Sequence, residues 1–118
     1  MAANIYDTAN LLARQLKETE EYTEYQRLKQ VAYEDSTNRA LLDELKKLQF
    51  RMQARAASGD RPDEEEMQKL MRISSLLQLN QDASAYLLAE FRYQKLIADI
   101  YKILGDTAGI DIDALTQA

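Results

Sequence analysis

The sequence DASAYLLAEFRYQKLIADIYKIL, residues 82–104, decides the fold class. It contains neither Gly nor Pro, and it predicts one helix of about six turns. On a helical wheel its apolar side chains cover well over half of the circumference, whereas an ordinary surface helix has an apolar arc of about 100°. We therefore expect a central helix that contacts more than one neighbour. The main stripe consists of Tyr86, Ala89, Tyr93, Leu96, Ile97, Ile100 and Leu104, and Leu87, Phe91, Ala98 and Tyr101 widen it.

Glu90 lies near the middle of that apolar arc, between Tyr86 and Tyr93. Burying a carboxylate is costly unless it is paired or hydrogen-bonded. We therefore predict that Glu90 is a buried polar anchor, with Arg51, Arg55 or a tyrosine hydroxyl as its partner. The sequence offers no histidine, cysteine or obvious nucleophile that would make this residue a catalytic acid.

Composition narrows the classes of function. The 118 residues correspond to one domain by length. Cysteine and histidine are both absent, which removes disulfides, thiolate and imidazole metal ligands, and the usual general base. We therefore expect no cofactor, no bound metal and no enzymatic activity. The formal net charge of −5 argues against nonspecific binding of nucleic acid.

The setting expected from the sequence is the cytoplasm. No segment is long and apolar enough to span a membrane. The first ten residues, MAANIYDTAN, lack the basic and apolar regions of a signal peptide.

Four further segments have the apolar repeat of a helix, at residues 5–16, 19–33, 37–57 and 64–79. Asn4, Thr19 and Asp35 are the expected caps of the first three. The first should bury Ile5, Ala9, Leu12, Ala13 and Leu16, and the second Tyr22, Tyr25, Leu28 and Ala32. Residues 105–118 show no core pattern, so we expect a flexible tail. The chain is thus predicted to be all-α, a single domain of about five helices, with N-terminal helices in 1–34 and a hairpin and central helix in 35–104.

The segment SGDRP, residues 58–62, is the clearest break in the chain. Asp63 and Glu66 follow it with the spacing of a capping box, which predicts a helix start. So short a connection joins antiparallel neighbours, which predicts a long hairpin of residues 37–57 and 64–79. Its expected seams are Leu41, Leu45, Leu48 and Met52 on one arm and Met67, Leu70, Met71, Ser74 and Leu77 on the other. Phe50 points away from its seam, toward either a helix of the same chain or another subunit.

Two charged clusters allow a chemical interpretation beside a plain one. The four carboxylates of residues 63–66 could hold a hard cation. However, consecutive helical positions diverge by about 100°, so compensation of the helix dipole is preferred. Lys47, Arg51 and Arg55 form a basic stripe that could bind an RNA backbone. The plain interpretation is a solvated face or pairing with nearby acids, and Asp43, four residues before Lys47, supports it.

Several short motifs, in this order and spacing, resemble the YheA/YmcA/YlbF-like family of small bacterial helical proteins, and most closely its YheA-type branch. They are Glu21-Tyr22, the run QFRMQ at 49–53 before Gly59, Glu64-Glu65, and Ala89-Glu90 followed by Leu96-Ile97 and Ile100. The resemblance covers nearly the whole chain and implies a cytoplasmic, all-helical, often dimeric protein with a long hairpin. Relatives in the YmcA and YlbF branches belong to a complex that modulates an endoribonuclease and mRNA processing, and so influences competence, sporulation and biofilm formation. The iron–sulfur clusters of that complex depend on cysteines, so they do not carry over to this chain.

The sequence as a whole favours a non-enzymatic adaptor that acts through protein–protein contacts. Because five short helices have limited means to cover their apolar surface, we expect a homodimer, or else a hetero-complex with other proteins of the family. The residues expected in the contact are Phe50, Met52, Leu48, Arg51, Arg55, Met67, Leu70 and Met71. One rival is an RNA-binding accessory protein that uses the Lys47, Arg51 and Arg55 stripe. The other rivals are a purely structural self-associating protein and, disfavoured by composition, a hydrolase or metal enzyme.

Overall fold

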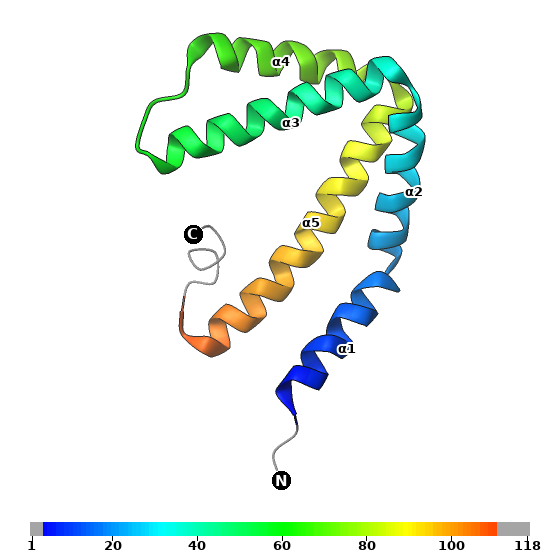
Figure 1. Ribbon diagram of the computed structural model, residues 1–118, viewed down its shortest axis with the longest axis vertical. Coiled ribbons are helices and arrows are strands. Elements are labelled where there is room, and N and C mark those ends of the chain that lie inside the picture. Colours follow the sequence, from blue (N-terminus) through cyan, green and yellow to red (C-terminus); the bar gives the residue numbers. More distant parts are fainter. Residues whose placement is uncertain (1–3, 111–118) are drawn as a thin grey trace. The chain divides into compact units, whose positions relative to one another are not determined.

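The computed structural model describes residues 4–110, and these form five helices joined by short connections (Figure 1). The helices are α1 (Ile5–Lys17), α2 (Glu20–Glu34), α3 (Ser36–Ala57), α4 (Glu64–Gln78) and α5 (Gln81–Ala108). Residues 4–110 contain no strand, so the all-α prediction is confirmed. No helix within these residues is long and apolar enough to cross a membrane.

The chain divides into two compact units, which are described separately. The hairpin unit is Arg27–Leu87, and the terminal unit combines Met1–Gln26 with Leu88–Ala118. The expected organisation as a single domain stays a prediction.

The hairpin unit is built around α3 and α4, which pack against each other. The side chain of Asp35 caps α3 by accepting a hydrogen bond from the backbone N–H of Asn38 at 3.0 Å. After α3 ends at Ala57, Gly59 takes a φ of +80°, a left-handed conformation that glycine adopts without steric cost. The carboxylate of Asp63 then caps α4 by accepting from the N–H of Glu65 at 2.9 Å. The predicted break and hairpin are therefore both present.

Side chains from all four helical segments of the hairpin unit form its core. The buried apolar residues are Ala32, Leu42, Leu45, Leu48, Ile73, Leu77, Ala83 and Tyr86. The predicted seam of α3 is correct at Leu45 and Leu48 but wrong at its ends, because Leu42 is fully buried while Leu41 and Met52 are only half-buried. The helix is rotated so that Leu42, one position on, faces the neighbouring helices.

The seam of α4 also differs from the prediction. Ile73 and Leu77 are buried and Leu70 is half-buried, whereas Met67 and Met71 are exposed. The inward positions are thus 70, 73 and 77, at helical spacings of three and four. The capping box is incomplete as well, since Glu66 bonds to Arg55 across the hairpin.

The terminal unit contains α1, the first turns of α2 and the C-terminal part of α5. Thr19 caps α2, since its hydroxyl donates to the carbonyl of Leu16 at 2.7 Å and accepts from the N–H of Tyr22 at 3.2 Å. The ring of Tyr93 stacks on Tyr25, with centroids 5.0 Å apart, and meets Tyr22 edge to face at 5.7 Å. These aromatic pairs join the start of α2 to α5.

Helix α2 is less buried than predicted. Ala32 is buried, but Tyr22, Tyr25 and Leu28 are only half-buried. For the two tyrosines, the contacts with Tyr93 cover only part of each ring.

Helix α5 begins as a new helix after a turn. The side chain of Asn80 accepts a hydrogen bond from the N–H of Ala83 at 3.0 Å, which is the contact of an N-cap. The helix then continues to Ala108, past the predicted end at residue 104. Helical hydrogen bonding and the exposed pair of Lys102 with Asp106 at 3.1 Å extend it where no core pattern exists. The expected tail therefore starts too early, and its residues 111–118 lie outside the described part of the chain.

Candidate interaction surfaces

The end of the hairpin beside the connecting segment 58–63 is held by an ionic contact between its arms. A guanidinium nitrogen of Arg55, Nη2, lies 3.3 Å from Oε1 of Glu66 and 3.9 Å from Oδ2 of Asp63. The second oxygen of Glu66, Oε2, is buried and has no hydrogen-bond partner among the described residues. Arg55 therefore acts as a clamp between α3 and the start of α4.

A second ionic contact lies further along the same pair of helices. The ammonium of Lys69 on α4 lies 2.8 Å from Oε1 of Glu44 on α3, and Arg51 approaches the same oxygen at 3.9 Å. The hydrogen bond from Lys69, followed by its charge, lowers the pKa of Glu44, and the charges of Arg51 and Lys47 lower it further. The carboxylate of Glu44 thus interacts with three cationic side chains.

These contacts show which residues of the predicted basic stripe already pair with acidic side chains of the same chain. Arg55 is committed to Glu66, and Arg51 has only a distant share of Glu44. Lys46 lies over the ring of Tyr86, with its ammonium 5.6 Å from the centroid. Both forms of the plain interpretation occur, since Arg55 pairs with Glu66 while Lys47 and Arg51 are exposed to solvent. The pairing of Glu44 with Lys69 was missed, because sequence spacing does not reveal which residues of two helices face each other.

The eight residues predicted to form a contact fall into three groups. Leu48 is buried inside the hairpin, so it is part of the core of this chain. Met52, Leu70 and Arg55 are half-buried. Phe50, Arg51, Met67 and Met71 are exposed, and Phe50 has 73% of its surface accessible.

Phe50 borders a hollow of about 410 Å³ on the outside of α3. Arg51, Ala54, Arg55, Ser58 and Asp60 also line it. This hollow joins an exposed aromatic ring to two guanidinium groups on a single helix face.

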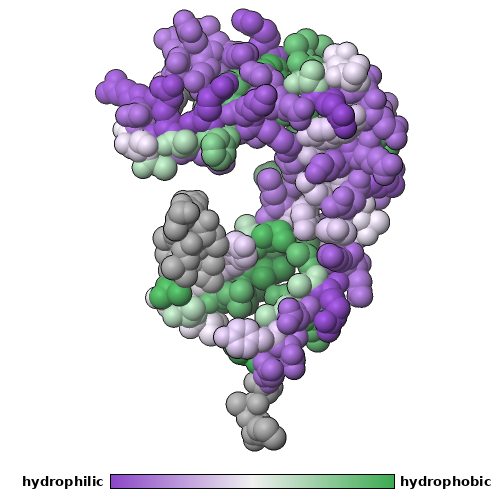
Figure 2. Space-filling view, in the orientation of Figure 1, coloured by the Kyte–Doolittle hydropathy of each residue, from purple (hydrophilic) through white to green (hydrophobic). Residues whose placement is uncertain are grey.

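The terminal unit leaves more apolar surface uncovered. Ala89 is the one buried side chain among its described residues, 4–26 and 88–110. Figure 2 shows hydrophobic side chains gathered over the C-terminal half of α5. The exposed large side chains of the unit are Ile5, Tyr6, Leu11, Leu12, Leu88, Phe91, Tyr101, Ile103, Leu104 and Ile110. They point to several sides of α1 and α5, and we call the set of ten residues the terminal apolar face.

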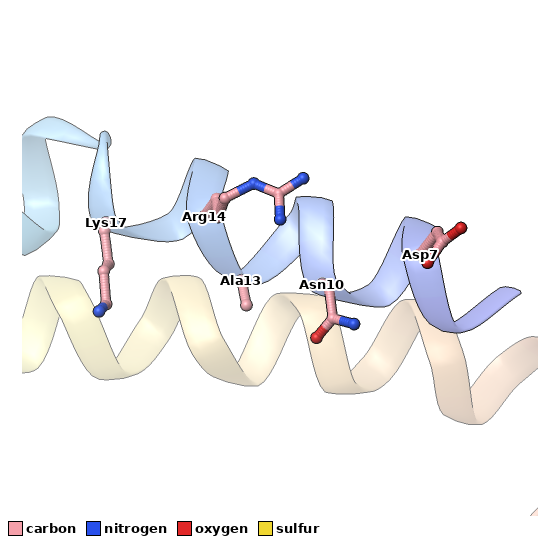
Figure 3. Close-up of a pocket in the computed structure, with 5 residues that line it drawn as sticks. All are labelled: Asp7, Asn10, Ala13, Arg14 and Lys17. Carbon is pink, nitrogen blue, oxygen red and sulfur yellow. The ribbon is translucent and has the colours of Figure 1, made fainter.

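Helix α1 is the extreme case. It is strongly amphipathic in sequence, yet none of its residues is buried, and Ile5 is 74% exposed. A hollow of about 580 Å³ lies along it, lined by Asp7, Asn10, Ala13, Arg14 and Lys17. Figure 3 shows Asn10, Ala13 and Lys17 pointing toward the neighbouring ribbon and Arg14 pointing away from it. The apolar face predicted for this helix exists, but little of this unit covers it.

Glu90 meets its prediction only in part. It is half-buried, and the nearby Leu88 and Phe91 on the same helix are exposed. It does interact with another group, and the proposed partners remain a prediction. No group of three or more carboxylates that could hold a metal ion occurs within residues 4–110, so the acids at 63–66 do not converge.

Comparison with known proteins is informative about family. Residues 5–107 match the family described as control of competence regulator ComK, YlbF/YmcA. A UPF0342 protein of Halothermothrix orenii is 37% identical over 100 residues, covering 85% of each chain. One from Caldicellulosiruptor bescii is 32% identical over 104 residues, covering 88% of this chain and 87% of its own.

Two solved structures share the fold. A protein of unknown function (DUF964) from Bacillus stearothermophilus superposes with a TM-score of 0.75 at 16% identity, over 89% of this chain and 92% of the other. Bacillus subtilis RicA, in its crystal structure in complex with RicF, gives a TM-score of 0.58 at 20% identity, over 89% and 93%. At these identities the likeness concerns the fold alone.

Proposed function

Because this chain belongs to the YlbF/YmcA family of competence-regulator control proteins, we propose that it is a non-enzymatic adaptor whose terminal unit is completed by a second helical chain of that family. The single observation that carries the proposal is the near absence of a core in the terminal unit, where Ala89 alone is buried among residues 4–26 and 88–110.

The physical argument rests on the terminal apolar face. Exposed apolar side chains gathered in one region mark interaction sites, because monomeric soluble proteins seldom leave large apolar patches in water. Burial of one Leu, Ile or Phe side chain is worth about 1.5–3 kcal/mol. A partner that covers only a few of these residues therefore gains enough to offset part of the entropy lost on association.

A chain of the same family is the partner that the comparisons support best. The structural neighbour RicA is in complex with RicF. The simplest arrangement for this chain is a homodimer, in which the same apolar face meets itself about a two-fold axis. A hetero-complex with another member of the family would use the same face.

The proposed contact differs from the one expected from sequence. The hairpin seams were expected to supply much of it, but Leu45, Leu48, Ile73 and Leu77 are buried inside the hairpin. We therefore move the main contact to the terminal apolar face. By resemblance, we propose that such an assembly takes part in controlling mRNA processing and development in the bacterial cytoplasm.

Sedimentation equilibrium of the full chain at micromolar concentration tests this function. We expect a dimer that Phe91→Asp converts to monomer, because an unpaired carboxylate in an apolar contact costs several kcal/mol. Met71→Asp is the matched control: it places the same charge at an exposed apolar position of the hairpin unit, and it should leave the dimer intact.

A clean monomer would rule out the homodimer. In that case, addition of a purified partner from the same family should form a complex that Phe91→Asp disrupts. If neither assembly forms, the proposed function is wrong.

A further inference from the structure

The hairpin unit carries a second surface, on the outside of α3, that the proposed assembly does not use. We propose that this surface, formed by Phe50, Ala54, Lys47 and Arg51, docks an acidic amphipathic helix of another protein. It belongs to the hairpin unit, whereas the proposed assembly uses the terminal unit, so the two proposals can fail independently.

The apolar part of the surface is Phe50 with Ala54. They are one helical turn apart, so they lie side by side on α3. Phe50 is 73% exposed, and both residues line the hollow of about 410 Å³. A large ring beside a small alanine leaves room for one inserted apolar side chain, and aromatic residues of this kind often anchor interfaces.

The charged part is the adjacent row of Lys47 and Arg51, again one turn apart. Lys47 is exposed, and Arg51 shares Glu44 with Lys69, which donates a hydrogen bond to that carboxylate at 2.8 Å while Arg51 stays 3.9 Å away. The guanidinium of Arg51 is thus poorly neutralised, and its side chain is 52% exposed. A carboxylate from a partner would give it the close, forked hydrogen bonds that Glu44 does not.

The two rows suggest a helix as the occupant. On this surface an apolar row lies beside a basic row. A partner helix would match it with an apolar row beside an acidic row, because side chains three or four positions apart lie along one face of a helix. A partner helix therefore needs one large apolar residue opposite the hollow and carboxylates about one turn apart opposite Lys47 and Arg51. Complementary charge of this kind sets orientation as well as attraction.

An acidic helix fits better than RNA. Arg55 is engaged by Glu66 at 3.3 Å, so only Lys47 and Arg51 of the stripe remain for phosphates. Affinity for a nucleic-acid backbone grows with the number of phosphates neutralised. A long polyanion is also repelled by the net charge of −5 of the whole chain. A short helix interacts mainly with charges within the screening length of about 8–10 Å.

Fluorescence anisotropy with the full chain tests the proposal. The probe is a labelled synthetic helical peptide of about 18 residues, long enough to be helical, with Glu at i and i+4 beside one Leu row. The counter-probe carries Lys in place of each Glu. We expect the acidic peptide to bind and the basic one not to bind.

Two variants and a matched control locate the site. Phe50→Ala should weaken the acidic peptide about tenfold, as for an anchor residue, and Arg51→Glu should abolish binding. Arg72→Glu makes the same charge change at another exposed position of the hairpin unit and should leave affinity within about twofold. Circular dichroism confirms that each variant is folded, and Phe50→Leu replaces Phe50→Ala if that variant is not.

Three results would overturn the proposal. Failure of the acidic peptide to bind removes the docking site. Equal loss with Arg72→Glu means that net charge alone acts. Tighter binding of an oligouridine probe, lost in Arg51→Glu, reassigns the surface to nucleic acid.

Discussion

Asn38 and Asn80, at the starts of α3 and α5, join their side chains inside the hairpin unit. Nδ2 of Asn38, which is buried, donates to Oδ1 of Asn80 at 3.0 Å. The same oxygen accepts from the N–H of Ala83 at 3.0 Å, so one amide oxygen both caps α5 and satisfies a buried donor. This contact sets where α5 begins relative to α3.

Replacement of Asn80 by alanine should therefore be unusually costly. Loss of the cap accounts for about 0.5–2 kcal/mol, and the unpaired donor of Asn38 adds roughly 1–3 kcal/mol. Asn80→Asp keeps an acceptor and should recover most of the stability. Denaturant unfolding gives these values. Asn4→Ala, which removes an exposed cap from α1, is the control and should cost less; a larger loss there would contradict the role of Asn80.

Asp63 should stabilise the hairpin more than Asp60 does. Its carboxylate caps α4 through the N–H of Glu65 and lies 3.9 Å from Arg55. Asp63→Ala should lower the free energy of unfolding by about 0.5–2 kcal/mol, the range for a lost N-cap. Asp60→Ala, in the exposed connection, should lower it less. Thermal unfolding of both variants provides the comparison, and the reverse order would mean that Asp63 is not the cap that matters.

Glu44 should make the hairpin sensitive to acid. Its pKa is lowered from the ordinary value of 4.5, mainly by the hydrogen bond and charge of Lys69. A lowered pKa in the folded state means that this contribution to stability is present above the unfolded pKa and is lost as pH falls through the folded pKa. Glu44→Gln should therefore flatten the decline of stability below about pH 4.5. Denaturant midpoints between neutral and acid pH measure this, and parallel curves for the two proteins would show that Glu44 contributes nothing.

Tyr93 should respond to alkali in the opposite sense. Desolvation raises its pKa above the ordinary value of 10.0, and Tyr22 and Tyr25 raise it further. The folded state holds this proton more tightly, so the contribution is present below the unfolded pKa and lost as pH rises through the folded one. Ultraviolet absorbance of phenolate should show a late-titrating group that disappears in Tyr93→Phe. Tyr6→Phe is the control at an exposed position, and loss of the same late component there would reassign it.

The existence and the starts of the helices could be predicted because they depend on local chemistry. Asp35, Thr19 and Asp63 stand where backbone N–H groups need acceptors, and Gly59 follows α3 where a positive φ is required. Which side of each helix is buried depends on the helices that pack against it. Leu41 and Leu42 are equally apolar, and only the packing decides which of them is buried.

Charged residues at the ends of the seams explain the remaining errors. The inward stripe of α3 continues to Arg55, and that of α4 begins at Glu66, so both core faces end in half-buried ions that meet at 3.3 Å. Charged positions do not contribute to an apolar repeat. The sequence pattern therefore places Met67 and Met71 in the seam in place of Ile73, and it places Glu66 in the cap.

The predicted contact residues differ in exposure, and their role in a contact remains a prediction. The sequence pattern singles out Phe50 because this residue lies off the apolar seam of its helix. Phe50 is exposed, so it does not pack beneath a helix of its own chain, and a contact with another subunit remains a prediction. The terminal apolar face was not identified, because an amphipathic helix such as α1 has the same sequence pattern whether or not a partner within the chain covers it.

The division of the chain has a consequence for the order of folding. The hairpin closes over a connection of a few residues, whereas the terminal unit joins two stretches of chain separated by the whole of Arg27–Leu87. The entropic cost of loop closure grows with the length of free chain between two contacts. The contacts of Tyr93 with Tyr22 and Tyr25 are therefore expected to become favourable only after the intervening segment has folded. Because α3 and α4 precede α5 along the chain, we expect the hairpin to form first and the terminal segments to meet last. Segments that fold last should open first, so the backbone amides of α1 should exchange hydrogen with solvent at the lowest opening free energy in the protein. A partner that slows this exchange would stabilise the segment that folds last.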